Sequence, residues 1–149
     1  MKVRSVSASR FIDAPAQAIF DLLADPRRHH ELDGSTSVRA VRDAPARLSL
    51  GATFSMSMRI VLPYRVTNTV VVFDEPRAIA WQHWAQFIWR YDLAEEGGAT
   101  RVTESFDYDR PWAWTIIALR WPQKNRAAME ETLATIERIV SPTRGPSSS

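Results

Sequence analysis

The chain has 149 residues, of which 45% are hydrophobic and 24% charged, with a formal net charge of +2 and no cysteine. This length fits one domain with a real core, and the composition is that of a globular protein, not of a disordered or fibrous one. Without cysteine, disulfides, thiolate nucleophiles and cysteine-ligated metals are excluded.

Charge and hydropathy patterns exclude two further classes of protein. The 19 basic residues are scattered among 17 acidic ones, so we expect no phosphate-binding stripe and no nucleic-acid partner. The longest apolar runs, such as 70–73, are far shorter than the ~20 residues that cross a bilayer. The first residues lack the apolar stretch of a secretory signal. We therefore expect a cytoplasmic protein without an integral membrane segment.

The N-terminal part of the chain predicts one strand and two short helices. Residues 3–12 alternate with period two, which is typical of a strand. Asp13 and Pro15 then suit the cap and first turn of a helix, and an apolar stripe continues that helix to about Ala24. The helix is expected to end at 25–26. A second short helix or turn is expected at 27–32, followed by a turn at 33–35.

Between residues 38 and 108 the pattern predicts only strands. Breaks and turn signals such as Pro63 and Gly97-Gly98 separate them. Short connections without helices indicate antiparallel pairing. The expected strands cover 38–41, 52–60, 64–73, 78–84, 87–93 and 100–108.

From Pro111 the apolar period is again that of a helix. Pro122 removes a backbone donor and is expected to kink or restart this helix. The apolar stripe after it comprises Met129, Leu133, Ile136 and Val140. We expect the folded domain to cover 1–140, and the tail at 141–149, which has almost nothing to bury, to be disordered.

This order of elements resembles the helix-grip fold of the birch-pollen-allergen and START-related superfamily. Local phrases are similar to its bacterial polyketide cyclase/dehydrase-like branch: IDAPA at 12–16, LADP at 23–26, LDGS at 32–35, FDEPRAIAW at 73–81, GATRVTE at 98–104 and MEETL at 129–133. The resemblance implies an α+β fold in which a curved antiparallel sheet of six to seven strands surrounds the terminal helix, with a cavity between them. It implies no single chemistry, because members include cyclases, dehydratases and lipid or hormone carriers.

Strand alternation selects the residues that would line this cavity. If Ile79 and Trp81 point inward, His83 lies on the same face, and the inward face of 64–72 runs from Tyr64 to Val72. The inferred interior is aromatic and Met-rich. The predicted ligand-binding residues are Met56, Met58, Asn68, Trp81, Trp89, Tyr91, Val102, Phe106 and Trp114.

Glu104 and His83 are the titratable candidates for catalysis. A buried carboxylate is costly unless it is paired, and desolvation would raise the pKa of Glu104, which suits a general acid, a general base or a ligand anchor. The alternative is that Glu104 meets Arg59, Arg90 or a backbone amide and only satisfies the core. His83 can shuttle protons near neutral pH, or can be structural or solvent-facing.

One short segment, with His29, His30, Glu31 and Asp33, carries side chains of the kind that bind metals. Adjacent histidines on a helix point about 100° apart, so they do not easily share one ion, and we expect no metal. We predict instead that His30 and Asp33 rim the entrance of the pocket, with Asp33 and Ser35 ordering the turn.

The six tryptophans, at 81, 84, 89, 112, 114 and 121, are many for this length. Aromatic walls suit flat or polycyclic ligands, although core packing explains such residues equally well. Trp112 and Trp114 stand between the last strand and the helix, so an exposed apolar patch there would mark a lid or the contact of a homodimer.

Three functions fit these patterns. The leading hypothesis is binding of a small hydrophobic molecule, aromatic, polyketide or lipid-like. The second is a cofactor-independent polyketide cyclase or dehydratase that uses His83 and Glu104 as acid and base, with Tyr91 or Asn68 orienting a carbonyl oxygen. The third is a protein-interaction module that uses the Trp-rich C-terminal surface. The chain has no Gly-rich phosphate loop, no Gly-x-Ser-x-Gly elbow and no His-Glu-x-x-His motif, so an enzyme would need no bound cofactor.

Overall fold

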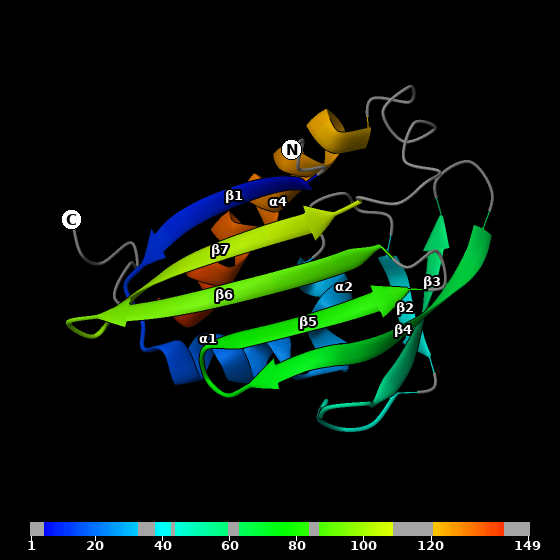
Figure 1. The fold of residues 1–149 in the computed structure, drawn as a ribbon, viewed down its shortest axis with the longest axis horizontal. Coiled ribbons are helices and arrows are strands. Elements are labelled where there is room, and N and C mark those ends of the chain that lie inside the picture. Colours follow the sequence, from blue (N-terminus) through cyan, green and yellow to red (C-terminus); the bar gives the residue numbers. More distant parts are fainter. Residues whose placement is uncertain are drawn as a thin grey trace.

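In the part of the chain that the structure describes, the fold has two layers, an antiparallel sheet of seven strands and a group of helices that covers one of its faces (Figure 1). The computed structural model describes residues 5–32, 38–42, 44–59, 63–83, 87–108 and 121–141. The elements are β1 (Ser5–Ile12), α1 (Ala16–Leu23), the 3-10 helix η1 (Pro26–Arg28), α2 (His29–Leu32), β2 (Val38–Arg42), β3 (Thr53–Arg59), β4 (Pro63–Asp74), β5 (Ala78–His83), β6 (Ile88–Glu96), β7 (Ala99–Asp107) and α4 (Trp121–Val140).

The strand order is β1-β7-β6-β5-β4-β3-β2, and each adjacent pair is antiparallel. Figure 1 shows α1, α2 and α4 behind the curved sheet, with α4 running behind β1 and β7. The α+β helix-grip architecture predicted from the sequence is therefore confirmed, with seven strands. Gly97 and Gly98, at φ of 62° and 87°, form the predicted tight turn between β6 and β7.

The start of α1 differs from the sequence prediction. Its N-cap residue is Pro15, and α1 has no hydrogen bond to the side chain of its cap residue. The prediction of Asp13 as the cap is therefore wrong. The backbone N–H of Ala16 instead donates to Glu95 Oε1 of β6 at 2.8 Å. A carboxylate from a distant strand thus takes the position at the positive end of the helix that a local side chain usually holds.

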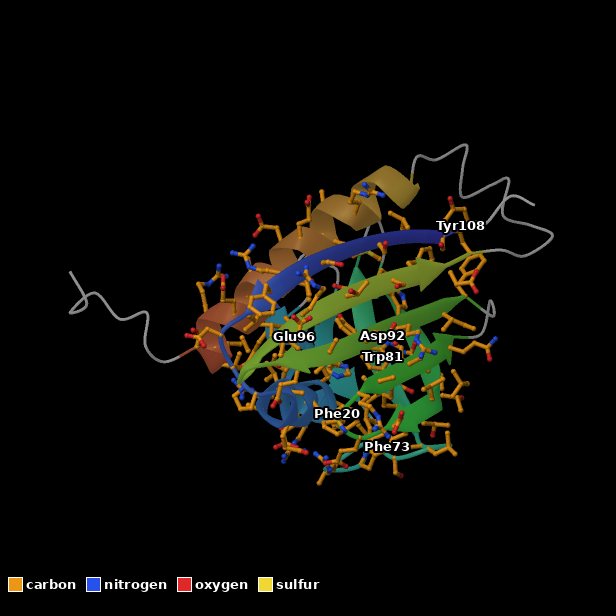
Figure 2. All side chains as sticks on the ribbon, turned by 60° about the vertical axis from the view of Figure 1, so that its left-hand side comes forward. Phe20, Phe73, Trp81, Asp92, Glu96 and Tyr108 are labelled. Atoms are coloured by element: carbon orange, nitrogen blue, oxygen red, sulfur yellow. The ribbon has the colours of Figure 1, made fainter. Side chains whose placement is uncertain are left out.

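A register shift in β4 moves the inward face of that strand. The pairing with β5 runs from Val70 opposite Trp81 to Val72 opposite Ala80, with one extra residue between them. After the bulge it is Phe73, and not Val72 as predicted, that packs on the core, with its ring centroid 5.1 Å from that of Phe20 (Figure 2). Strict alternation fails here because a bulge inverts the two faces.

The apolar stripe of α4 packs as the sequence predicts. Met129, Leu133 and Ile136 are buried, and Val140 packs against the main core. Pro122 is the second residue of α4, where a missing backbone donor has little cost. Ser141, the first residue of the predicted tail, is 3% exposed and donates its N–H to the carbonyl of Glu137. The helical packing therefore extends at least to that residue.

Candidate functional site

The concave face of the sheet carries a continuous group of aromatic side chains on its central strands. Trp81 of β5 lies opposite Trp89 of β6, which lies opposite Phe106 of β7. The ring centroids of Trp89 and Phe106 are 4.6 Å apart, and those of Trp81 and Tyr91 are 5.7 Å apart. Trp81, Tyr91 and Phe106 are buried, and Trp89 is partly buried. Strand alternation thus brings together four of the predicted ligand-binding residues as one aromatic surface.

A carboxylate and a phenol meet on this face. Tyr91 and Glu104 are directly opposite each other on β6 and β7, and the Tyr91 hydroxyl donates to Glu104 Oε2 at 2.9 Å. Both side chains are buried, at 6% and 3% exposure. Arg90, offered as one partner for Glu104, instead pairs with Asp92, 2.9 Å from Nε to Oδ2, on the opposite side of the strand. Tyr91 is therefore one partner of Glu104, and Arg90 is engaged with Asp92 instead.

Glu104 lies on β7 between residues of two separate hydrophobic clusters. Val102, which is fully buried, belongs to the main hydrophobic cluster with Leu133 and Ile136 of α4. Phe106, two residues further along β7, belongs to a second cluster with Met129. Among the described residues, partly buried Ala8 and Trp89 pack against both clusters. Figure 2 shows Tyr108, of the second cluster, at the far end of the sheet from Phe20.

Asn68 is the second buried polar group predicted for the site. It is 2% exposed, and within the part of the chain that the structure describes its Nδ2 has no hydrogen-bond partner. Asn68 lies opposite Phe54 on β3 and opposite His83 on β5. Residues directly opposite in an antiparallel pair share a face, so the amide lies on the same side of the sheet as the Phe54 ring.

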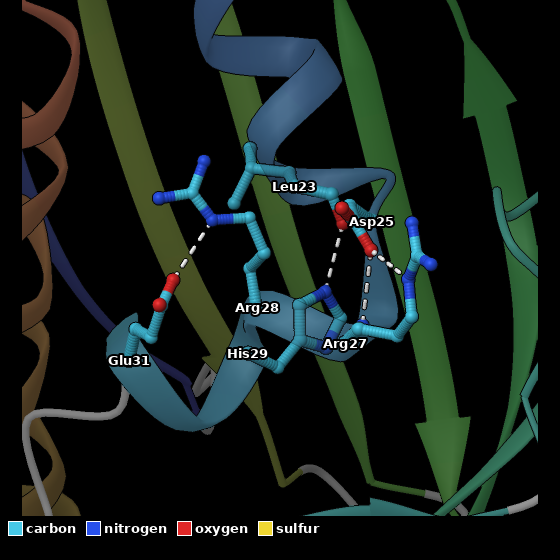
Figure 3. A network of polar contacts seen from close by, with 6 residues as sticks. All are labelled: Leu23, Asp25, Arg27, Arg28, His29 and Glu31. Carbon is cyan, nitrogen blue, oxygen red and sulfur yellow. Dashed lines mark hydrogen bonds and ion pairs between the residues drawn. The ribbon is translucent and has the colours of Figure 1, made fainter.

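His29 is a buried residue that sequence reasoning did not place in the site. It is 6% exposed, its ring stacks on Trp81 at 4.9 Å with 24° between the planes, and it meets Phe54 edge-on at 5.3 Å. Its Nε2–H donates to the carbonyl oxygen of Leu23 at 2.8 Å (Figure 3). Burial lowers the pKa of His29. This effect is larger than those of the hydrogen bond to Leu23 and of the charge of Asp25, both of which raise the pKa. The ring is therefore a neutral part of the aromatic surface.

The segment around His29 also contains an ion pair and a hydrogen bond from the backbone to a carboxylate. Arg28 Nε lies 2.8 Å from Glu31 Oε2, and Asp25 Oδ1 accepts from the backbone N–H of Arg27 (Figure 3). Asp25 thus caps η1 directly after α1 ends. In the described part of the chain no three His, Asp or Glu side chains are grouped so that they could hold a metal ion.

Several predicted site residues cannot be placed. Asp33 and Trp114 lie outside the described residues, as do the side chains of His30, Met56, Met58 and His83. The backbone register nevertheless separates the two predicted catalytic residues. Glu104 lies level with Ile79 across β6, and His83 is four residues further along β5. That register corresponds to roughly 14 Å along the strand and about 10 Å across it.

The antiparallel sheet and the helices that cover one of its faces define the helix-grip class of folds. The family model for polyketide cyclase/dehydrase and lipid transport proteins matches residues 3–140, so the chain belongs to this family. The resemblance inferred from the sequence is thereby confirmed. No helix in the described ranges is long and apolar enough to cross a membrane.

Among sequence relatives, the uncharacterized protein Rv0088 of Mycobacterium tuberculosis (strain ATCC 25618 / H37Rv) is 43% identical over 105 residues, which are 69% of this chain and 47% of that protein. The chain thus spans about half the length of the curated relatives that it matches.

Two solved structures are similar in fold at low identity. Protein Ms6760 from Mycobacterium smegmatis has a TM-score of 0.71 at 18% identity, over 97% of this chain and 99% of that chain. The AHSA1-like protein from Aeromonas hydrophila has a TM-score of 0.66 at 18% identity, over 93% of each chain. At these identities the likeness shows the fold alone.

Proposed function

We propose that this chain binds a small hydrophobic molecule, aromatic, polyketide or lipid-like, between the concave face of the sheet and α4. The observation that carries the proposal is the buried Tyr91–Glu104 pair on an aromatic surface. The family supports it, because cyclisation, dehydration and lipid transport all require a pocket for a largely apolar small molecule.

A buried carboxylate needs an explanation beyond stability. Taking an ionised carboxylate out of water costs several kcal/mol, and apolar residues of similar volume often fill such a position at no loss. Glu104 stands between Val102 and Phe106 on one face of β7, where an apolar residue would continue the pattern. We infer that the carboxylate is retained to accept a hydrogen bond from a ligand hydroxyl or to carry out chemistry on it.

The aromatic surface supplies the apolar part of such a site. Trp81, Trp89 and Phe106 present rigid rings that bury a large area while losing little side-chain entropy. Flat rings and acyl chains both fit a surface of this kind, and its few polar groups would fix their orientation.

Native mass spectrometry of the freshly purified protein, followed by thermal-shift screening of aromatic and fatty compounds, tests the proposal. The variant Glu104→Gln removes the charge, and Ser105→Ala is its matched control, because it changes the next residue of β7 on the opposite face. A copurified molecule, or a compound whose stabilisation weakens in Glu104→Gln and not in Ser105→Ala, supports binding at this site. If nothing copurifies and no compound shifts the melting temperature, the proposal fails.

The same pair favours a second candidate function, a cofactor-independent cyclase or dehydratase. A buried carboxylate can take a proton from carbon next to a carbonyl. The Tyr91 hydroxyl has a single proton, so it would turn from Glu104 to the substrate and donate its hydrogen bond to the carbonyl oxygen there. In this version Tyr91 assists Glu104 directly, since the register sets His83 apart from it. Glu104→Gln would then abolish turnover while the substrate still binds, whereas a carrier would show only a change in affinity.

The remaining sequence hypotheses keep the status of predictions. The interaction module and the homodimer both depend on Trp112 and Trp114, which lie outside the described residues. A cytoplasmic location is likewise a prediction from the sequence.

A further inference from the structure

Asn68 is buried with an unused donor. Its side chain is 2% exposed, and Nδ2 makes no hydrogen bond within the described residues. Leaving a buried amide donor unpaired costs about 1–3 kcal/mol, and an aliphatic side chain of the same shape would avoid that cost. Its presence on the face that carries the aromatic surface therefore indicates a partner that the described residues do not supply.

The surroundings of Asn68 are aromatic. Phe54 lies directly opposite it on β3, and the Phe54 ring meets His29 at 5.3 Å and Trp81 at 5.6 Å. All three of these side chains are buried. A flat apolar group placed against this cluster would lie on the face of the sheet that carries Asn68.

This position is distinct from that of Glu104. Strands β5 and β6 separate β4 from β7, and Asn68 is offset from the level of Glu104 by four residues along the sheet. On a flat sheet the two positions would be roughly 20 Å apart. A bicyclic or tricyclic ligand held at Asn68 therefore need not contact Glu104, and the two residues can be tested separately.

We propose that Asn68 is a specificity-determining residue of the ligand site, and that its Nδ2–H donates a hydrogen bond to a carbonyl or ether oxygen of the bound molecule. This inference rests on the proposed function and adds the chemistry of one end of the ligand, a flat apolar group with an acceptor oxygen at its edge. Such a site discriminates against an analogue that lacks the oxygen, because the amide is then left unpaired.

The planar ketone 9-fluorenone and its analogue fluorene, which has a methylene in place of the carbonyl, are suitable probes. Tryptophan-fluorescence titration should show that the wild-type protein binds fluorenone about tenfold more tightly. Asn68→Leu should remove this preference, and Asn68→Asp, which replaces the donor with an acceptor, should reverse it. The control Thr69→Val changes the neighbouring residue of β4 on the other face and should keep the preference.

A second measurement needs no ligand. If the amide is present for binding, Asn68→Leu should raise the melting temperature of the free protein by roughly 2–4 °C, because it removes a buried unpaired donor. A fall in melting temperature would mean that Asn68 stabilises the fold, and would overturn the inference. Equal affinity of the wild-type protein for both probes would overturn the role of Asn68 alone. If neither probe nor any other apolar compound binds, the proposed function fails as well.

Discussion

Replacing His29 by phenylalanine should remove one source of acid sensitivity in folding. The ring of His29 is buried against Trp81 and Phe54, and Nε2–H is bonded to the carbonyl oxygen of Leu23. Burial lowers the pKa of His29 below its ordinary value of 6.5. In the unfolded chain the same histidine titrates at about 6.5. Phenylalanine keeps an aromatic ring in the cluster and does not titrate.

The direction and size of the effect follow from proton linkage. Because the pKa of His29 is lower in the folded state, the unfolded chain takes up the proton first as pH falls. The contribution of His29 to stability is therefore complete above about pH 6.5 and is lost as pH falls toward the pKa of the folded state. At pH 5.5, one unit below the pKa of the unfolded histidine, the loss is at most about 1.4 kcal/mol, and any protonation of folded His29 makes it smaller.

Urea unfolding of the wild-type protein and His29→Phe at pH 7.5 and pH 5.5 measures this difference. Titrating carboxylates contribute equally to both proteins, and loss of the hydrogen bond to Leu23 lowers stability at both pH values. The free energy of unfolding of the wild-type protein should fall more than that of the variant over this interval, by up to about 1.4 kcal/mol. Parallel losses would refute the neutral, buried state of His29.

Three further substitutions probe the packing and the caps. Tyr91→Phe deletes the donor to the buried carboxylate of β7 and should lower the free energy of unfolding by about 1.5–3 kcal/mol in urea titrations; an unchanged value would mean that the bond contributes nothing. Glu95→Ala removes the acceptor for the Ala16 N–H and should cost about 1 kcal/mol, with faster hydrogen exchange at that amide. Leu133→Ala, at a fully buried position of α4, should cost about 2–5 kcal/mol, whereas Ile139→Ala, 37% exposed, should cost much less.

Periodicity predicted most of the fold because burial on one face is a local property of each element. The alternation in β7 puts Val102, Glu104 and Phe106 on the buried face, and the stripe of α4 buries Met129 and Leu133. The same reasoning correctly selected the aromatic side chains of β5 and β6. Residue types in a period of two or 3.6 are enough for such assignments.

What the sequence could not supply depends on contacts between distant segments. Glu95 caps a helix that begins 79 positions earlier, and no local pattern announces it. In the sequence His29 belongs to a group of side chains of the kind that bind metals, whereas in the structure it directly follows the 3-10 helix and its ring stacks on Trp81. The bulge that brings Phe73 inward is a property of the pairing with β5. The Pro26 and Asp25 break before His29 was the one signal that could have suggested a turn into the core.

The pairing of β1 with β7 bears on how the protein folds. Ser5 pairs with Asp107 and Ile12 with Thr100, so the first strand has its partner about 100 residues later in the chain. Closing so large a loop is entropically costly and is typical of slow-folding topologies. At ribosomal rates of about 5–20 residues per second, β1 waits roughly 5–20 s after its synthesis before β7 exists. During that interval Val6 and Ile12, which are buried in the folded protein, cannot be buried by pairing of β1 with β7. A chaperone that recognises short apolar segments could bind β1 during this interval.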